Sequence, residues 1–249
     1  EYAAKDLEDA FSAINAGWVY WSEDSLFDPE KAKYFTYLGT KSPKAIDRAY
    51  AFNNLGVIAN YSYDLDDHLA VARNYFEQAV EANNSSEEKI AWPYNNLARF
   101  YLYITPFQNV EKALLLAEQA TEIAEGEDFF VRFIRKNNIK NSWTQDDFAN
   151  ALEREIENSE MAYTELGYLM EDGGDFVSAL KWFLICDKLC KGEEATHSSD
   201  AVARIRLQIR GADFDKAEIA ARDWISSLTD QKTPTEVASA GLNQDQRLL

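Results

Sequence analysis

The feature that most constrains this chain is a two-block pattern that occurs three times along it. In the first block an aromatic residue stands three positions before a leucine, and glycine or alanine follows that leucine. In the second block small or bulky apolar residues recur at spacings of four and then three. The first blocks are Phe52–Gly56, Tyr94–Ala98 and Tyr163–Gly167, and the second blocks begin at Ala72, Ala113 and Ala179.

The spacing within each copy predicts two helices packed against each other. Residues three apart lie on the same side of a helix, so the aromatic residue and the leucine share one face. The small residue after the leucine lets a second helix approach closely. In the second block Ala72, Phe76 and Ala79 stand at i, i+4 and i+7, which makes them the answering face of that second helix.

This arrangement resembles the tetratricopeptide repeat, a helix–turn–helix unit that stacks into a solenoid. Leu166 and Ala179 are 13 positions apart, as in the standard tetratricopeptide repeat. The corresponding steps in the other two copies are 17 and 16 positions, which resemble the related Sel-one-like repeat. The resemblance therefore implies a repeat protein whose first helices line a concave surface.

We accordingly predict an all-α fold, a right-handed superhelix (α-solenoid) of about five to six antiparallel helix pairs. Scarce glycine (10) and proline (5) argue against a β-sandwich or barrel. The chain from 229 to 249 loses the periodicity and is predicted to be a poorly ordered tail or arm. The single solenoid is expected over 1–228, with clear repeats near 49–82, 91–125 and 160–191 and degenerate pairs near 3–38, 129–158 and 200–228.

The chain is strongly acidic, with 43 acidic and 25 basic residues and a net charge of −18. Such a surface disfavours nucleic acid, whose binding requires a basic footprint, and it disfavours anionic membranes for the same reason. No apolar run approaches the roughly 20 residues that a membrane span needs. We therefore expect neither nucleic-acid binding nor membrane insertion. The charge serves either solubility or the attraction of a basic partner.

Cysteine usage and the first residue bear on the compartment. Cys186 and Cys190 lie four positions apart on one predicted helix, an arrangement unfavourable for a disulfide, so reduced thiols are expected. This favours a cytoplasmic location. Because the chain begins at Glu1 rather than Met, an exported protein whose signal was removed remains the alternative.

Residues for catalysis do not assemble in the sequence. His68 and His197 are far apart and neither accompanies a nucleophile motif. The two cysteines lack the histidine and further cysteine partners of a zinc-site pattern, and there is no glycine-rich phosphate loop. We predict no enzyme activity, no cofactor and no metal; an enzyme built on a helical solenoid is the disfavoured alternative.

The family resemblance also implies which residues contact a partner. In tetratricopeptide proteins the exposed residues at positions two, five, nine and twelve of the first helix face the ligand, counting the leucine as position seven. The family's clamp for a C-terminal carboxylate uses Lys and Arg at these positions. Arg99 is the only basic residue among them here, so such a clamp is not indicated. Packing between repeats is the alternative role for these side chains. The predicted concave-face residues are Tyr50, Asn53, Asn60, Trp92, Asn95, Arg99, Thr164 and Tyr168.

Two binding functions follow from the sequence. The leading hypothesis is a protein–protein interaction module, an adaptor or scaffold that holds a peptide or protein partner in the concave groove. The alternative is an acidic inhibitor or immunity-type protein that neutralises a basic enzyme or toxin, suggested by the net charge of −18. Salt dependence of binding separates them, because electrostatic capture weakens as ionic strength rises.

Overall fold

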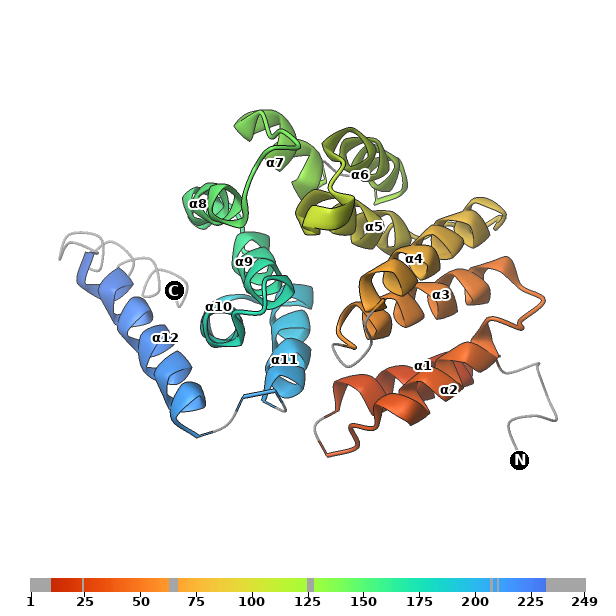
Figure 1. Ribbon diagram of the computed structural model, residues 1–249, viewed down its shortest axis with the longest axis horizontal. Coiled ribbons are helices and arrows are strands. Elements are labelled where there is room, and N and C mark those ends of the chain that lie inside the picture. The colour runs from red at the N-terminus through yellow and green to blue at the C-terminus, as the bar shows by residue number, and fades with distance from the viewer. Residues whose placement is uncertain are drawn as a thin grey trace, which may run out of the picture. The chain divides into compact units, whose positions relative to one another are not determined.

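A computed structural model describes residues 10–231 except 24, 63–66, 125–127, 207 and 210. These residues form twelve α-helices and one short 3-10 helix, without any strand, which confirms the all-helical prediction (Figure 1). Most of the predicted tail, 232–249, and residues 3–9 of the first predicted pair lie outside the described residues. The helix bounds are α1 Ala10–Ser22, α2 Pro29–Gly39, α3 Ala45–Asn60, α4 His68–Asn84, α5 Trp92–Tyr103, η2 Thr105–Phe107, α6 Val110–Ala124, α7 Phe129–Asn137, α8 Gln145–Glu155, α9 Met161–Asp172, α10 Phe176–Leu189, α11 Glu193–Ile205 and α12 Ala212–Gln231.

The chain divides into two compact units, unit 1 from Glu1 to Glu157 and unit 2 from Asn158 to Leu249. In unit 1, α1 packs on α2, α3 on α4 and α5 on α6, while α7 packs mainly against α6. In unit 2, α9 packs on α10, and both α11 and α12 also pack on α10. The expected pair near 200–228 therefore begins earlier, at Glu193, and its helices share α10 as their main neighbour. One continuous superhelix over 1–228 remains a prediction.

The three repeats recognised in the sequence are the pairs α3/α4, α5/α6 and α9/α10. Their helices approach closely where a glycine faces an aromatic ring. A Cβ atom added to Gly56 would lie 2.5 Å from the Phe76 ring, and one added to Gly167 would lie 2.5 Å from the Phe183 ring. In α5/α6 the equivalent positions hold Ala98 and Ala117, both fully buried. The small residue after the leucine thus matches the size of its neighbour, as close packing requires.

The pair α1/α2 follows the same design more closely than its sequence suggested. Gly17 stands at position eight of α1, and a Cβ there would collide with Thr36 of α2. Ala32, Thr36 and Gly39 supply the spacings of four and three, and all three are buried. Gly39 in turn lies against Ile14 of α1 and Ala51 of α3. The described part of the region near 3–38, predicted to be a degenerate pair, is therefore a close-packed helix pair with small residues at its contact.

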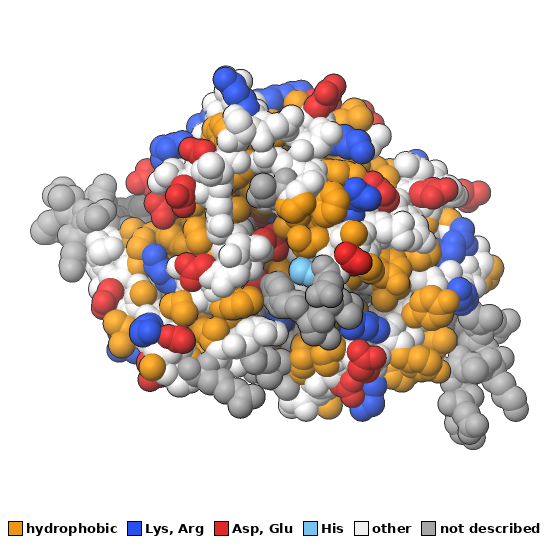
Figure 2. Space-filling model, in the orientation of Figure 1, with side chains coloured by type: hydrophobic (Ala, Val, Ile, Leu, Met, Phe, Trp, Pro, Cys, Tyr) orange, Lys and Arg blue, Asp and Glu red, His pale blue; other side chains and the backbone are white. Residues whose placement is uncertain are grey.

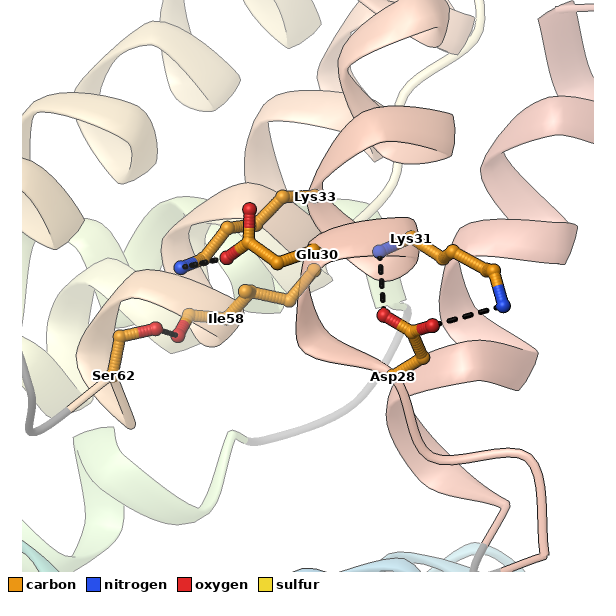
Figure 3. A network of polar contacts seen from close by, with 6 residues as sticks. All are labelled: Asp28, Glu30, Lys31, Lys33, Ile58 and Ser62. Carbon is orange, nitrogen blue, oxygen red and sulfur yellow. Dashed lines mark hydrogen bonds and ion pairs between the residues drawn. The ribbon is translucent and has the colours of Figure 1, made fainter.

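Polar side chains start two of these helices, as their sequences indicate. The Asp28 side chain accepts a hydrogen bond from the Lys31 backbone at 3.0 Å and pairs with its ammonium group at 2.9 Å (Figure 3). The backbone hydrogen bond, followed by the Lys31 side chain, lowers the pKa of Asp28. Thr144 and Asp147 form a reciprocal capping box at the start of α8, which satisfies two backbone donors. Pro29 at the first position of α2 also fits the helix start.

The state of the cysteines differs from the sequence expectation. The structure joins Cys186 and Cys190 in a disulfide, with Cα atoms 4.9 Å apart, where reduced thiols were expected. A helix normally sets residues four apart with parallel Cβ directions. Here α10 ends at Leu189 and Cys190 is its extended C-cap, so the second cysteine is released from helical geometry. The sequence reasoning placed both cysteines inside one helix and missed this boundary.

Candidate partner-binding face

The structure places the eight predicted contact residues in three kinds of environment. Trp92 is 49% exposed. Tyr50, Asn95, Arg99 and Tyr168 are half-buried. The side chains of the remaining three are withdrawn from solvent: Asn53 (4% exposed), Asn60 (5%) and Thr164 (2%). The structure therefore corrects the assignment of these three residues to an open contact surface, because a buried side chain presents no area to a partner.

The residues at position five connect successive first helices instead. Asn53 Oδ1 on α3 accepts a hydrogen bond from Asn96 Nδ2 on α5 at 2.9 Å. Thr164 on α9 donates its hydroxyl proton to the Glu194 carboxylate on α11. Each bond joins a first helix to the next first helix in the chain. The position that the family resemblance assigns to the ligand is therefore used here to hold neighbouring repeats together.

Asn95, the position-five residue of α5, follows the same rule. Its side chain hydrogen-bonds the carboxylate of Asp128, which is the N-cap of α7. Burial raises the pKa of Asp128, and hydrogen bonds from the Phe130 and Val131 backbones and from Asn95 oppose that rise. The position-five side chain of α5 thus bonds to α7, as those of α3 and α9 bond to α5 and α11. This agrees with the packing of α7 against α5 and α6.

Position twelve is also buried in every described repeat that has the leucine signature. Leu102 is fully buried and Asn60 is 5% exposed. Glu171 of α9 is fully buried, and its two carboxylate oxygens accept hydrogen bonds from Arg204 of α11 at 2.9 and 2.6 Å. Bidentate pairing of this kind compensates the free-energy cost of burying both charges. Position twelve is thus withdrawn from solvent, and position five is engaged with neighbouring helices, although Asn95 is only half-buried.

The large exposed side chains at these positions belong to a row of aromatic rings at position two. Phe11 of α1 contacts Tyr50 of α3 edge to face, with 5.9 Å between ring centroids, and Tyr50 contacts Trp92 of α5 in the same way at 6.0 Å. Phe11 and Trp92 are each 49% exposed. We call these three residues the aromatic ladder. It lies within unit 1 and crosses three consecutive first helices.

Sequence reasoning found two members of the ladder and missed the third. Tyr50 and Trp92 were assigned to position two by counting back from Leu55 and Leu97. Phe11 was missed because α1 has Ala16 where the leucine belongs. The signal was Gly17, which marks position eight and puts Phe11 at position two. The sequence contains no comparable indication of the bonds from position five, because an asparagine at this position is compatible both with solvent exposure and with contact to the next helix.

The main basic stretch of this acidic chain is largely neutralised internally. Arg135 of α7 pairs with Glu118 of α6 at 2.6 Å, and Lys136 pairs with the buried Glu155 of α8 at 2.6 Å. Arg132 lies over the Phe129 ring, 5.9 Å from its centroid. Figure 2 shows acidic and basic side chains interspersed on the face in view. The basic residues of α7 thus stabilise unit 1 rather than form a separate cationic patch.

The two histidines considered for chemistry lie on helices that do not carry the ladder. His68 begins α4 and His197 lies on α11, each half-buried. Across residues 10–231, apart from the gaps given above, no three His, Cys, Asp or Glu side chains gather as a metal ion would require. In the same described part of the chain, no helix is long and apolar enough to cross a membrane.

No protein-family model matches the chain, and no curated protein sequence is significantly similar to it.

Proposed function

We propose that this chain is a non-catalytic protein-interaction module of the tetratricopeptide type, whose helix pairs stack with a right-handed superhelical sense and whose partner binds along the aromatic ladder. The observation that carries the proposal is the ladder itself. Equivalent positions of three consecutive first helices hold large aromatic side chains, and two of them keep half their surface in solvent.

Burial energetics support this reading. Exposed aromatic side chains supply large contact areas at little cost in conformational entropy, and residues that dominate interfaces are enriched in Trp and Tyr. A soluble protein that kept these rings only for packing would gain by covering them. The exposed parts of Phe11 and Trp92 lie beside the half-buried Tyr50, so they form a contiguous apolar surface rather than isolated side chains.

Affinity capture with matched variants tests the proposal. The double variant Tyr50→Ala/Trp92→Ala removes two rungs, while Leu115→Ala removes an equally exposed apolar side chain (57% exposed) on α6, outside the ladder. We expect proteins captured from a lysate of the source cells by the wild type and by Leu115→Ala to be lost with the double variant. Circular dichroism checks that all three proteins are equally helical. Equal capture by all three would refute the ladder as the binding face.

The net charge of −18 supports a second candidate, an acidic inhibitor or immunity-type protein that neutralises a basic enzyme or toxin. Such a protein would associate quickly with its target, and the association rate would fall steeply with salt. Association rates of the captured partner at about 50 and 500 mM salt separate the two functions. A large drop in rate that is unchanged in Tyr50→Ala/Trp92→Ala favours the inhibitor.

A further inference from the structure

The ladder also indicates what kind of partner it receives, an inference that rests on the proposed function. We infer that the partner is an amphipathic α-helix with basic residues flanking its apolar stripe, laid across α1, α3 and α5. Three observations lead to this partner: the spacing of the rungs, the use already made of the neighbouring polar groups, and the charge of the chain.

The spacing of the ladder fits a helix. Neighbouring ring centroids are 5.9 and 6.0 Å apart. An α-helix rises about 1.5 Å per residue, so side chains at i, i+4 and i+8 are spaced by about 6 Å along its axis. A β-strand spaces side chains on one face by about 6.6 Å or more. The helical spacing of about 6 Å therefore matches the distance between neighbouring rings more closely than the strand spacing of about 6.6 Å does.

The polar groups beside the ladder favour a partner that needs none of them. An extended peptide brings unpaired backbone N–H and C=O groups, which must find partners on the receiving surface. Asn53 and Asn96, about one helical turn along the chain from Tyr50 and Trp92, are already bonded to each other. Asn95 binds Asp128, and its Oδ1 atom, which has no partner within the described structure, is itself buried. A helix satisfies its own backbone and therefore loses nothing on this surface.

The negative charge of the chain indicates which residues flank the apolar stripe of the partner helix. The chain carries a net charge of −18. Exposed charges of both signs lead into the rungs, with Glu87, Glu88 and Lys89 before Trp92 and Lys41 and Lys44 before Tyr50, so the negative excess belongs to the chain as a whole. Lys or Arg residues beside the apolar stripe of the bound helix would be attracted to this surface, and acidic residues would be repelled.

Synthetic peptides test the inference directly. One peptide of about 18 residues carries Leu at i, i+4 and i+8 with flanking Lys residues, long enough to form several helical turns. A second peptide has the same composition with its Leu residues at i, i+2 and i+4, the periodicity of a strand. Fluorescence anisotropy of labelled peptide gives the dissociation constant for the wild-type protein. We expect the helical peptide to bind at least tenfold more tightly than its rearranged counterpart, and Glu in place of the flanking Lys to weaken it.

Variants place the peptide on the ladder. Phe11→Ala and Trp92→Ala, at the two ends, should each raise the dissociation constant of the helical peptide about tenfold or more, as truncation of a central interface aromatic does. Leu115→Ala should leave it unchanged. Two variants at opposite ends guard against a local folding defect in either one.

The outcomes separate this inference from the proposed function. If the strand-patterned peptide binds as tightly as the helical one, the helical partner is wrong. If neither peptide binds while the captured partner still depends on Tyr50 and Trp92, the partner class is again wrong and the interaction module stands. If the helical peptide binds equally well to Trp92→Ala, Phe11→Ala and Leu115→Ala, the ladder is not its site and the inference fails.

Discussion

Asn53 of α3 accepts a hydrogen bond from Asn96 of α5 across 2.9 Å. Asn53 is 4% exposed, and the bond joins two first helices that belong to different repeats. An amide at position five therefore serves the stacking of repeats in this protein, although the resemblance to tetratricopeptide repeats implied that it contacts a ligand.

The first prediction concerns this bond. Asn53→Ala should lower the free energy of unfolding by about 1–3 kcal/mol, because it leaves the Asn96 amide without its acceptor in a half-buried place. Asn96→Ala should have a similar effect, and the double variant should cost less than the two singles together. Urea unfolding followed by circular dichroism measures all three. Strict additivity would show that the two amides do not depend on each other.

The second prediction tests the close approach of paired helices. Gly56→Ala should destabilise the protein by about 1–3 kcal/mol, because the new methyl group meets the buried Phe76 ring. This cost exceeds the gain of about 1 kcal/mol that alanine brings to a helix interior.

The natural pair Ala98 and Ala117 supplies the matched control for that variant. Gly56→Ala combined with Phe76→Ala reproduces the α5/α6 combination in α3/α4. The double variant should be more stable than the sum of the single effects predicts. The same urea experiment measures the coupling, and no coupling would mean that the glycine is there for another reason.

The third prediction concerns the buried pair of Glu171 and Arg204. Glu171→Gln or Arg204→Met alone should cost about 3–5 kcal/mol, because each leaves an uncompensated charge or polar group inside unit 2. Glu171→Leu together with Arg204→Met should recover most of that loss, since apolar residues of similar volume often replace a buried pair without penalty. Thermal unfolding of the three variants provides the comparison. A double variant as unstable as the singles would contradict it.

The fourth prediction concerns alkaline pH. The Tyr101 hydroxyl donates to Glu77 at 2.6 Å, and burial followed by that bond raises the pKa of Tyr101 from 10.0 to about 12. Because the pKa is higher in the folded state, the stabilisation from this group is complete below about pH 10 and is lost as pH rises toward 12.

Tyr101→Phe isolates this effect. The variant should lose less stability than the wild type between about pH 10 and pH 12, by at most about 3 kcal/mol for two pKa units. Urea midpoints at both pH values give the difference. Tyr94→Phe is the matched control, because burial raises the pKa of Tyr94 as well but its hydroxyl contacts the neutral Asn84. Parallel pH profiles for wild type and Tyr101→Phe would contradict the assignment.

Local features of the fold were readable because their causes lie close together in the chain. The spacing from Tyr163 to Gly167 and from Ala179 to Cys186 predicts two helical faces, and the structure has α9 and α10 there. The start of α2 is capped by Asp28 just before Pro29, and that of α8 by Thr144 with Asp147. Each rests on residues within one or two helical turns.

The candidate site was less accessible to such reasoning. Tyr50 and Trp92 were found because they keep a fixed distance from a leucine, whereas Phe11 belongs to a repeat without that leucine. Asn53 and Thr164 were assigned to the groove by position alone. Nothing in their own segments distinguishes a side chain that faces solvent from one that faces the next helix.

The amino-acid sequence by itself determined that this chain forms paired helices and, in three of the pairs, which small residues let them touch. These properties depend on helical periodicity and capping, which are local. The tertiary structure alone decided that position five bonds to neighbouring helices, that position twelve is buried, and that Phe11, Tyr50 and Trp92 form one row. That outcome depends on the distance between helices some forty residues apart in the chain, and such distances are set by the packing of all the side chains between them.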